Sequence, residues 1–252
     1  MVRRCQELSL CLWALFASKV APYSWAVMKI SVIIPTLNEA GRIADVVTRT
    51  RKLGQCEIIV VDGGSEDETL SRARSVADQA LLAPRGRALQ QNAGAAAATG
   101  EILLFLHADC WLEPGSLEEI RDAVAGGGCA AGCFRQRIDA TGLTYRLLER
   151  GNAARVRCLG WAYGDQGIFV RRDLFERIGR FPEVGLMEDL LLSKRLKRAG
   201  GLRLLGPRLH VSPRRWQKNG IVRQTLRNWL LLALAHCGIP PDTLARHYVD
   251  VR

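Results

Sequence analysis

The sequence predicts an α/β protein built on a doubly wound, mostly parallel sheet with helices on both faces. Two observations carry this prediction. Apolar runs with the length of buried strands alternate with longer segments of helical character over residues 29–106. Each apolar run is followed at once by polar side chains or glycines, which are expected where parallel strands end at the carboxyl edge of a sheet.

The first two predicted strands are Ile30 to Ile34 and Ile58 to Val61. Both are apolar throughout, as expected for strands that are buried on both faces. A helix follows each strand, and the second helix begins at Ser65 and Glu68, which have the spacing of a capping box. We expect these helices to end near residues 53 and 76.

A third, short strand is predicted at residues 80–82, and a helix from Ala88 to Thr99 follows it and ends at Gly100. The apolar run Ile102 to Leu106 is the fourth strand, and it stops abruptly at His107 and Asp109. Alternation puts these two side chains on the same side of the backbone, so that one cation or one phosphate could contact both. The alternative is a solvated strand end without a ligand.

The composition suits one domain with a full core, because the chain has 252 residues and 48% of them are hydrophobic. The net charge is +11, and its location is informative. Between Leu190 and Pro241 there is no acidic residue, and eleven basic residues account for the whole excess: Lys194, Arg195, Lys197, Arg198, Arg203, Arg208, Arg214, Arg215, Lys218, Arg223 and Arg227. This basic belt predicts an anionic partner, with a solvated basic face as the alternative.

The eight cysteines form no CxxC pair and have no zinc-site spacing with histidine, which predicts a reducing compartment and no structural metal. At the amino terminus, Arg3 and Arg4 precede an apolar stretch, Leu8 to Ser18, that is similar to a leader but too short to span a bilayer. Met28 stands immediately before the first strand. Residues 1–27 are therefore an extension, either a leader or a misassigned start, and residues 28–252 form a single domain with a basic, helical carboxyl-terminal part.

The residues that follow the strands suit a nucleotide. They offer acceptors for a ribose and a base, guanidinium groups for phosphates, and a carboxylate for a divalent cation that bridges the phosphates. Neither GxGxxG nor GxxxxGK occurs, which argues against a dinucleotide oxidoreductase and a P-loop enzyme. The residues are Thr36, Asn38 and Glu39 after the first strand, Asp62 after the second, Arg85 and Arg87 after the third, and His107 and Asp109 after the fourth.

Several longer segments together resemble the family-2 glycosyltransferases of the GT-A fold, and most closely a small bacterial subgroup of uncertain substrate. The segments are KISVIIPTLNEAGRI, EIIVVDGGSEDET, APRGRALQQNAGA, ILLFLHADC, YGDQGIFVRRDLFERIGRFPE, MEDLLLSKRLKRAG and RRWQKNG. They occur in the expected order, and the resemblance covers roughly Met28 to Tyr248. The resemblance implies an inverting enzyme that moves a sugar from a nucleotide-sugar donor, with UDP-sugar favoured, and that needs Mg²⁺ or Mn²⁺. The alternative is a catalytically inactive nucleotide- or glycan-binding module on the same fold.

The resemblance also assigns roles on the donor side. Pro35, Thr36, Asn38 and Glu39 match the loop that holds the base and the ribose, and Asp62 matches the acidic residue that contacts the base. The alternative for these residues is ordinary turn chemistry.

His107, Ala108 and Asp109 match the D-x-D motif, whose last aspartate binds the metal on the diphosphate. The first position holds histidine here in place of aspartate. Asp109 therefore keeps the metal role, whereas His107 could ligate the metal, hydrogen-bond the ribose or diphosphate, or only pack.

Glu188 and Asp189 match the pair at a helix start where the family has its catalytic base, and Asp189 is the predicted base. An inverting transferase needs a carboxylate that takes the acceptor's proton as the acceptor oxygen attacks the anomeric carbon. The alternative is that both acids only favour a helix amino terminus. Gly164, Asp165 and Gln166 resemble the acceptor-side loop that closes over the sugar.

Arg215 and Trp216 match the end of the Q-x-x-R-W motif of processive members, but Ser212 occupies the glutamine position, which favours a single transfer. Trp216 is expected on the acceptor side. Arg215 could neutralise the leaving diphosphate, as could Arg214, and His210 is a further candidate metal ligand.

Residues 220–237 are predicted to be a helix that is apolar over Trp229 to Ala235. It is either a core helix or, beside the basic belt, a helix that rests on an anionic membrane surface, which would suit a lipid or lipid-linked acceptor. This predicts a cytoplasmic protein, peripheral on the inner face of the plasma membrane in the second case. The basic residues lack interleaved aromatic side chains, so nucleic acid is not an expected partner.

Overall fold

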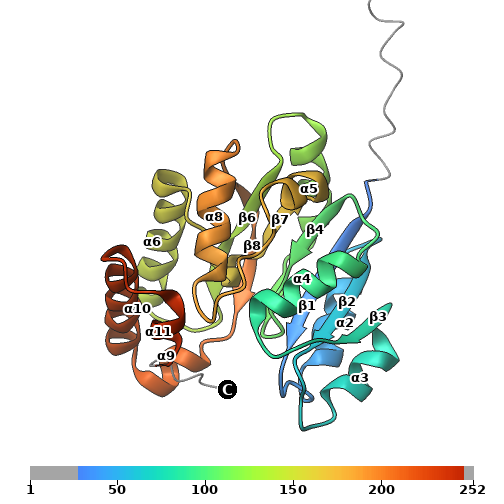
Figure 1. Ribbon diagram of the computed structural model, residues 1–252, viewed down its shortest axis with the longest axis horizontal. Helices are drawn as coiled ribbons and strands as arrows, with labels where there is room; N and C mark the ends of the chain where they lie inside the picture. The colour runs from blue at the N-terminus through green and yellow to red at the C-terminus, as the bar shows by residue number, and fades with distance from the viewer. Residues whose placement is uncertain (1–27, 247–252) are drawn as a thin grey trace, which may run out of the picture.

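A computed structural model of the chain describes residues 28–246 (Figure 1). The predicted extension at residues 1–27 lies outside the described residues. One sheet carries the fold, with the strand order β3-β2-β1-β4-β7-β6-β8-β5. Its strands are β1 (Ile30–Thr36), β2 (Glu57–Asp62), β3 (Gln79–Leu82), β4 (Ile102–Phe105), β5 (Cys110–Leu112), β6 (Ala131–Ile138), β7 (Ile168–Arg171) and β8 (Arg203–Val211).

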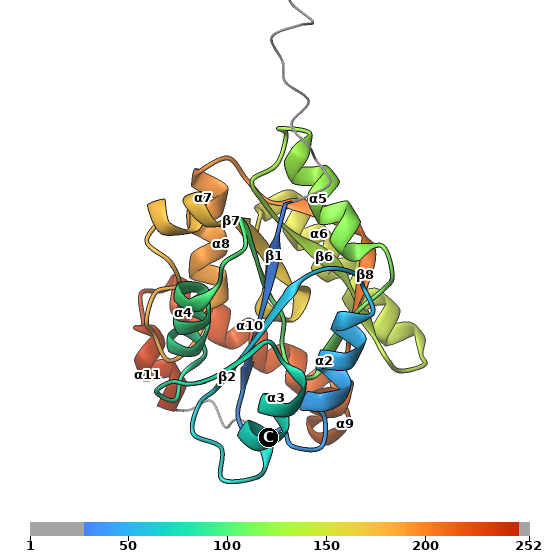
Figure 2. The same cartoon turned by 90° about the vertical axis from the view of Figure 1, so that its right-hand side faces the viewer.

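Helices cover both faces of this sheet, as predicted (Figure 2). Alternate residues of the central strands point to opposite faces: Val32 and Val60 pack into one apolar cluster, and Ile33 and Val61 into the other. The first cluster includes residues of α2 (Ile43–Arg51), α3 (Thr69–Val76) and α5 (Ser116–Ala125). The second includes residues of α4 (Arg87–Ala97), α6 (Leu143–Leu159), α7 (Arg172–Arg177) and α8 (Glu188–Arg198).

The amino-terminal half of the sheet is parallel, as the alternation of strands and helices predicts. Strand β1 pairs in parallel with β2 and β4, and β2 with β3. In the other half, β7 runs antiparallel to both β4 and β6, while β8 is parallel to β6 and antiparallel to β5. Because Thr36 and Asp62 are register partners at the ends of β1 and β2, the residues after these strands emerge side by side.

The predicted capping box at Ser65 and Glu68 is wrong. Helix α3 begins at Thr69, and its cap residue Glu68 makes no side-chain capping hydrogen bond. Asp67 takes this role, because its carboxylate accepts a hydrogen bond from the Thr69 N–H at 2.9 Å. Ser65 is instead used by the neighbouring loop, where its hydroxyl accepts a hydrogen bond from the Asn38 N–H at 2.8 Å.

The carboxyl-terminal part is helical, as predicted. It consists of α9 (Arg214–Asn219), α10 (Ile221–His236) and α11 (Pro241–Arg246), which lie together beside the lower ends of α6 and α8 in Figure 1. Over residues 28–246, none of the helices is both long and apolar enough for a bilayer crossing.

Candidate active site

The two loops after β1 and β2 are joined by hydrogen bonds. Asn38, which has a left-handed backbone with φ of 53°, accepts a hydrogen bond from the Glu66 N–H on its side-chain oxygen at 2.9 Å. The Glu39 N–H donates to the Thr69 hydroxyl at 2.8 Å. Asparagine tolerates this conformation better than most residues, so the sequence PTLNE suits a tight turn. Both loops are thereby held at the carboxyl edge of the sheet.

Asp62 ends β2 and is fully buried. One of its carboxylate oxygens accepts hydrogen bonds from the N–H groups of Gly64 and Ser65, at 2.7 and 2.6 Å. The other, Oδ2, has no hydrogen-bond partner among residues 28–246. A buried carboxylate oxygen without a donor is costly, so this atom suits a ligand that supplies an N–H group.

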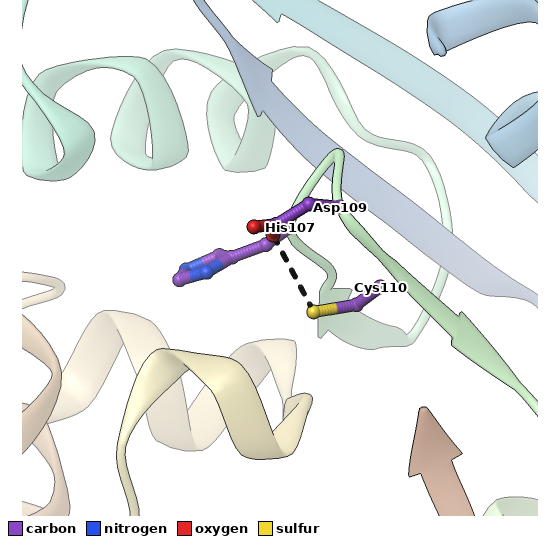
Figure 3. A group of neighbouring side chains, drawn as sticks. All are labelled: His107, Asp109 and Cys110. Carbon is purple, nitrogen blue, oxygen red and sulfur yellow. Dashed lines mark hydrogen bonds between the residues drawn. The ribbon is translucent and has the colours of Figure 1, made fainter. Parts of the chain in front are cut away.

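His107, Asp109 and Cys110 come together in the turn after β4 (Figure 3). Their ligand atoms all lie within 4.8 Å of one another. The Cys110 thiol donates to Asp109 Oδ1 at 3.6 Å, so the sulfur faces the carboxylate. Imidazole nitrogen and carboxylate oxygen together suit Mn²⁺, and carboxylate oxygen alone suits Mg²⁺. The imidazole and the carboxylate of this group therefore fit the divalent cation that the sequence predicts, whereas the Cys110 sulfur is a softer ligand than either cation prefers.

Arg214, at the start of α9, lies between this turn and the first strand-end loop. Its Nη2 atom is 3.5 Å from Asp109 Oδ2 and 3.7 Å from Glu39 Oε1. The guanidinium group thus links two predicted donor-side carboxylates. Arg215 and Trp216 follow in α9, and Trp216 packs against the apolar core.

Asp189 lies in the first turn of α8 and contacts the predicted acceptor-side loop. Its Oδ2 atom accepts a hydrogen bond from the Gly164 N–H at 2.6 Å, and its Oδ1 atom accepts one from the Leu190 N–H at 2.6 Å. A Cβ atom on Gly164 would come within 2.6 Å of His107 Nε2 and 3.4 Å of Asp189 Oδ2. Only glycine fits here, and it brings the strand-end turn, the loop and α8 into contact.

Glu188 has a different environment from Asp189. It is buried, and its Oε1 atom pairs with Arg87 Nε at 3.0 Å. Arg87, the first residue of α4, is predicted to contact phosphates, and the Glu188 carboxylate holds its side chain. Arg85, also predicted to contact phosphates, is exposed on the loop before α4. Of the two adjacent acids, Asp189 is the one that lines a cavity.

This cavity has a volume of about 130 Å³ and is lined by Arg87, His107, Tyr163, Asp165, Asp189 and one side of α10, among others. A smaller cavity of about 40 Å³ joins His107 and Asp165 to Asp109 and Trp216. The two cavities share His107, Asp165 and Asn228. The predicted metal, base and acceptor-side residues therefore line two cavities that share three residues.

Sequence reasoning missed several residues of this region. Burial raises the pKa of the Tyr163 phenol, and the Arg155 guanidinium, which lies 3.6 Å over its ring, opposes that effect. Gln136 donates to Asp165 Oδ2 at 2.8 Å. Asn228 in α10 accepts a hydrogen bond from Gln224 at 2.9 Å, and this polar pair, four residues apart on an apolar helix, is the one signal that could have identified it.

His210 was a further candidate metal ligand, but its ring nitrogens face other groups. Nδ1 lies 2.6 Å from Asp139 Oδ1 and Nε2 lies 3.2 Å from Glu113 Oε1. The ring also stacks on Trp111 at a centroid distance of 3.7 Å. With both nitrogens engaged, His210 is not oriented toward Asp109.

Two curated relatives of this chain are glycosyltransferases by name. The chain is 29% identical over 178 residues to the glycosyltransferase AglE of Haloferax volcanii, covering 61% of this chain and 56% of the relative. It is 30% identical over 160 residues to an undecaprenyl-phosphate 4-deoxy-4-formamido-L-arabinose transferase of Enterobacter sp., covering 58% of this chain and 49% of the relative. The chain thus spans about half the length of these curated relatives.

Solved structures show the same fold. Staphylococcus aureus TarS in complex with UDP-GlcNAc superposes with a TM-score of 0.58 at 20% identity, over 73% of this chain and 58% of that chain. Mycobacterium tuberculosis glucosyl-3-phosphoglycerate synthase, in complex with Mn²⁺, UDP and glucosyl-3-phosphoglycerate, gives 0.57 at 21% identity, over 85% and 82%. The predicted GT-A fold is confirmed. Because the model of glycosyl transferase family 2 matches residues 31–179, more than half of the described fold, the chain belongs to that family.

Proposed function

We propose that this chain is an inverting glycosyltransferase that moves a sugar from a UDP-sugar, bound with a divalent cation, to an acceptor carried by a lipid. One observation carries the proposal. His107, Asp165 and Asp189, which come from a strand end, a loop and a helix start, line one cavity in a chain of a glycosyltransferase family. A donor diphosphate held near Asp109 would bring the sugar to this cavity.

The donor is proposed from the strand-end loops. The free Oδ2 atom of Asp62 suits the N–H group of a pyrimidine base, and Asn38 and Glu39 lie on the adjoining loop. The UDP and UDP-GlcNAc complexes of the two solved neighbours are consistent with a uridine nucleotide.

Asp109 would hold the divalent cation, with His107 as the second candidate ligand. When bound, such a cation neutralises the charge that develops on a leaving diphosphate. The chain's own cations support the same charge: Arg214 lies against Asp109, and Arg215 follows it in α9.

Asp189 is the proposed base. Its carboxylate lines the cavity, and hydrogen bonds from Gly164 and Leu190 fix its orientation. It would accept the proton of the acceptor hydroxyl while the hydroxyl oxygen attacks the anomeric carbon from the face opposite the diphosphate. The bond to the diphosphate breaks as the new glycosidic bond forms, which inverts the anomeric centre.

A lipid-linked acceptor is proposed from the surface of α10. Val222, Leu226, Trp229 and Leu230 are exposed on it, Trp229 at 67%, and Arg223 lies among them. Such a helix suits the interface of an anionic membrane, here the inner face of the plasma membrane. The Enterobacter relative is by name an undecaprenyl-phosphate transferase.

The test is a product assay with a panel of nucleotide sugars and two kinds of lipid acceptor, lipid phosphates and lipid-linked sugars with free hydroxyl groups, with Mn²⁺, Mg²⁺ or chelator. We expect UDP-sugars to be used and chelator to stop transfer, with inversion seen by NMR at the anomeric carbon. Tight donor binding without transfer to any acceptor, or to water, would instead identify a binding module.

A further inference from the structure

Another concave region lies between α6, β6 and β8. It has a volume of about 350 Å³, and six arginines and a single glutamate line it. None of its lining residues lines either cavity of the candidate active site. This arginine groove consists of Arg135, Arg137, Arg146, Arg150, Arg157 and Arg208, with Glu149 as its one acid.

The single carboxylate is already used. Glu149 accepts a hydrogen bond from the Ile138 N–H at 2.7 Å, pairs with Arg146 at 2.8 Å and lies 3.6 Å from Arg137. Arg146 also donates to the carbonyl groups of Ile138 and Ala140, so it is a structural residue of the turn before α6. Glu149 therefore compensates the charges of Arg137 and Arg146, and it forms no ion pair with the other four arginines of the groove.

The remaining four arginines have side chains that make no hydrogen bond or ion pair with another residue between 28 and 246. They are Arg135, Arg150, Arg157 and Arg208, of which Arg208 lies near enough to Glu113 that, against the effect of burial, its charge helps to lower the pKa of that carboxyl. These four positive charges line the same concave region and therefore repel one another, which arginines spread over a surface do not. A bound anion would convert the repulsion into attraction.

Rigid elements fix the positions of these four residues. Arg135 and Arg208 are register partners on the parallel strands β6 and β8, so they lie side by side. Arg150 and Arg157 are seven residues apart in α6, about two turns, which puts them on one face of the helix. The planar guanidinium group offers paired N–H donors that match phosphate oxygens.

We propose that the arginine groove is a phosphate-binding site, distinct from the donor site, for a ligand that carries a phosphomonoester or diphosphate group. The group is either free or part of a lipid headgroup. The groove is coupled to the acceptor side, because Gln136 lines it and also donates to Asp165 at 2.8 Å. A phosphate bound in the groove would therefore lie beside Gln136, which holds Asp165 of the predicted acceptor-side loop.

The first experiment titrates inorganic pyrophosphate into the full chain by calorimetry, in chelator and at a constant ionic strength of about 0.1 M. The groove variant is Arg150→Gln with Arg208→Gln, which removes one free guanidinium from each wall. The matched control is Arg74→Gln with Arg198→Gln, since both residues are exposed arginines of helices outside the groove. We expect about tenfold weaker binding in the groove variant than in the control variant, the scale expected for the loss of two solvent-exposed ion contacts.

The donor site is measured separately on the same proteins, by titration of UDP with Mn²⁺. The groove variant is expected to bind UDP like the wild type, and Asp109→Ala to lose UDP while it retains pyrophosphate. This pattern keeps the two sites distinguishable: loss of the donor site alone would contradict the proposed function and leave the groove intact. Equal pyrophosphate affinity in the groove and control variants would overturn the groove assignment.

Vesicles distinguish a free phosphate from a lipid headgroup. Phosphatidic acid presents a phosphomonoester and phosphatidylglycerol a diester, and both are tested in phosphatidylcholine at equal surface charge. Extra recovery on phosphatidic acid that the groove variant loses would assign the ligand to a lipid. Equal recovery on both, with groove-dependent pyrophosphate binding, would assign it to a soluble phosphate.

Discussion

Replacing Asp189 with asparagine tests whether its carboxylate is the base, because the side chain keeps its shape but can no longer accept a proton at neutral pH. The carboxylate accepts one hydrogen bond on each oxygen, from Gly164 and from Leu190, both at 2.6 Å. An amide has a single oxygen, so asparagine keeps one of these bonds and turns its NH₂ group toward the other N–H donor. The substitution therefore removes the proposed base and one charge-assisted hydrogen bond at once.

The two losses have different magnitudes and different readouts. Loss of a hydrogen bond to a charged group costs about 2 kcal/mol of folding free energy, and for a chain of this size that lowers Tm by about 4–8 °C. Loss of a general base reduces turnover by about a hundredfold, or about 2.7 kcal/mol of activation free energy. Donor affinity is expected to stay near that of the wild type, because Asp189 contacts the predicted acceptor-side loop.

The assay measures product formation at 25 °C, where the variant stays folded, together with donor titration and thermal unfolding. Glu188→Gln is the matched control, because it removes the adjacent carboxylate and its ion pair with Arg87 at 3.0 Å. We expect this variant to lose stability but to keep turnover within a few fold. Normal turnover in Asp189→Asn, with the hundredfold loss in Glu188→Gln, would refute the assignment of the base.

Three further predictions concern other parts of the chain. Asp109→Ala is expected to abolish the effect of Mn²⁺ on donor affinity while Tm stays within a few degrees of the wild type. Donor titration with Mn²⁺ and with chelator measures this effect, and an unchanged metal dependence in the variant would contradict the role of Asp109. Trp229→Ser is expected to weaken binding to anionic vesicles about tenfold or more, since a buried aromatic side chain contributes about 1.5–3 kcal/mol, and binding should fall with salt. Leu82→Ser, at an equally exposed apolar position on β3, is the control for sedimentation, and equal losses in both would argue against α10. Burial would raise the pKa of Glu57, but hydrogen bonds from Ser31 and Thr99 and the charge of Lys29 outweigh it and lower the pKa to about 2. The unfolding free energy should therefore fall by about 3 kcal/mol as pH drops from about 5 to 2, and Glu57→Gln, followed by denaturant unfolding, should remove that part of the pH dependence.

The parallel half of the fold was predictable because its strands are buried on both faces. Ile30 to Ile34 and Ile102 to Leu106 are continuous apolar runs, and helices with clear ends separate them. The direction of the antiparallel strand β7 depends on contacts with β4 and β6 that no local pattern encodes. Strand β5 has three residues, too few for any period to appear.

In the candidate site, contacts between residues that are close in sequence were also predictable, and contacts between distant residues were not. His107 and Asp109 follow one strand, so their proximity could be read from the chain. The contact of Gly164 with Asp189 and His107 joins residues that are distant in sequence, and it exists because the sheet brings α8 and the loop together. The capping box at Ser65 failed for a related reason: a loop from another strand competes for that hydroxyl.

Arg214 pairs with Asp109 and Glu39, so cation binding at the predicted donor site and the position of the carboxyl-terminal helices affect each other's free energy. A cation that binds Asp109 competes with the guanidinium group 3.5 Å away, so it weakens one attachment of α9 to the body of the protein. Linkage is reciprocal, and whatever stabilises α9 and α10 in another position raises the affinity for the cation by the same factor. A surface that holds α10 would in this way change the affinity of Asp109 for a cation, without contact between the surface and Asp109.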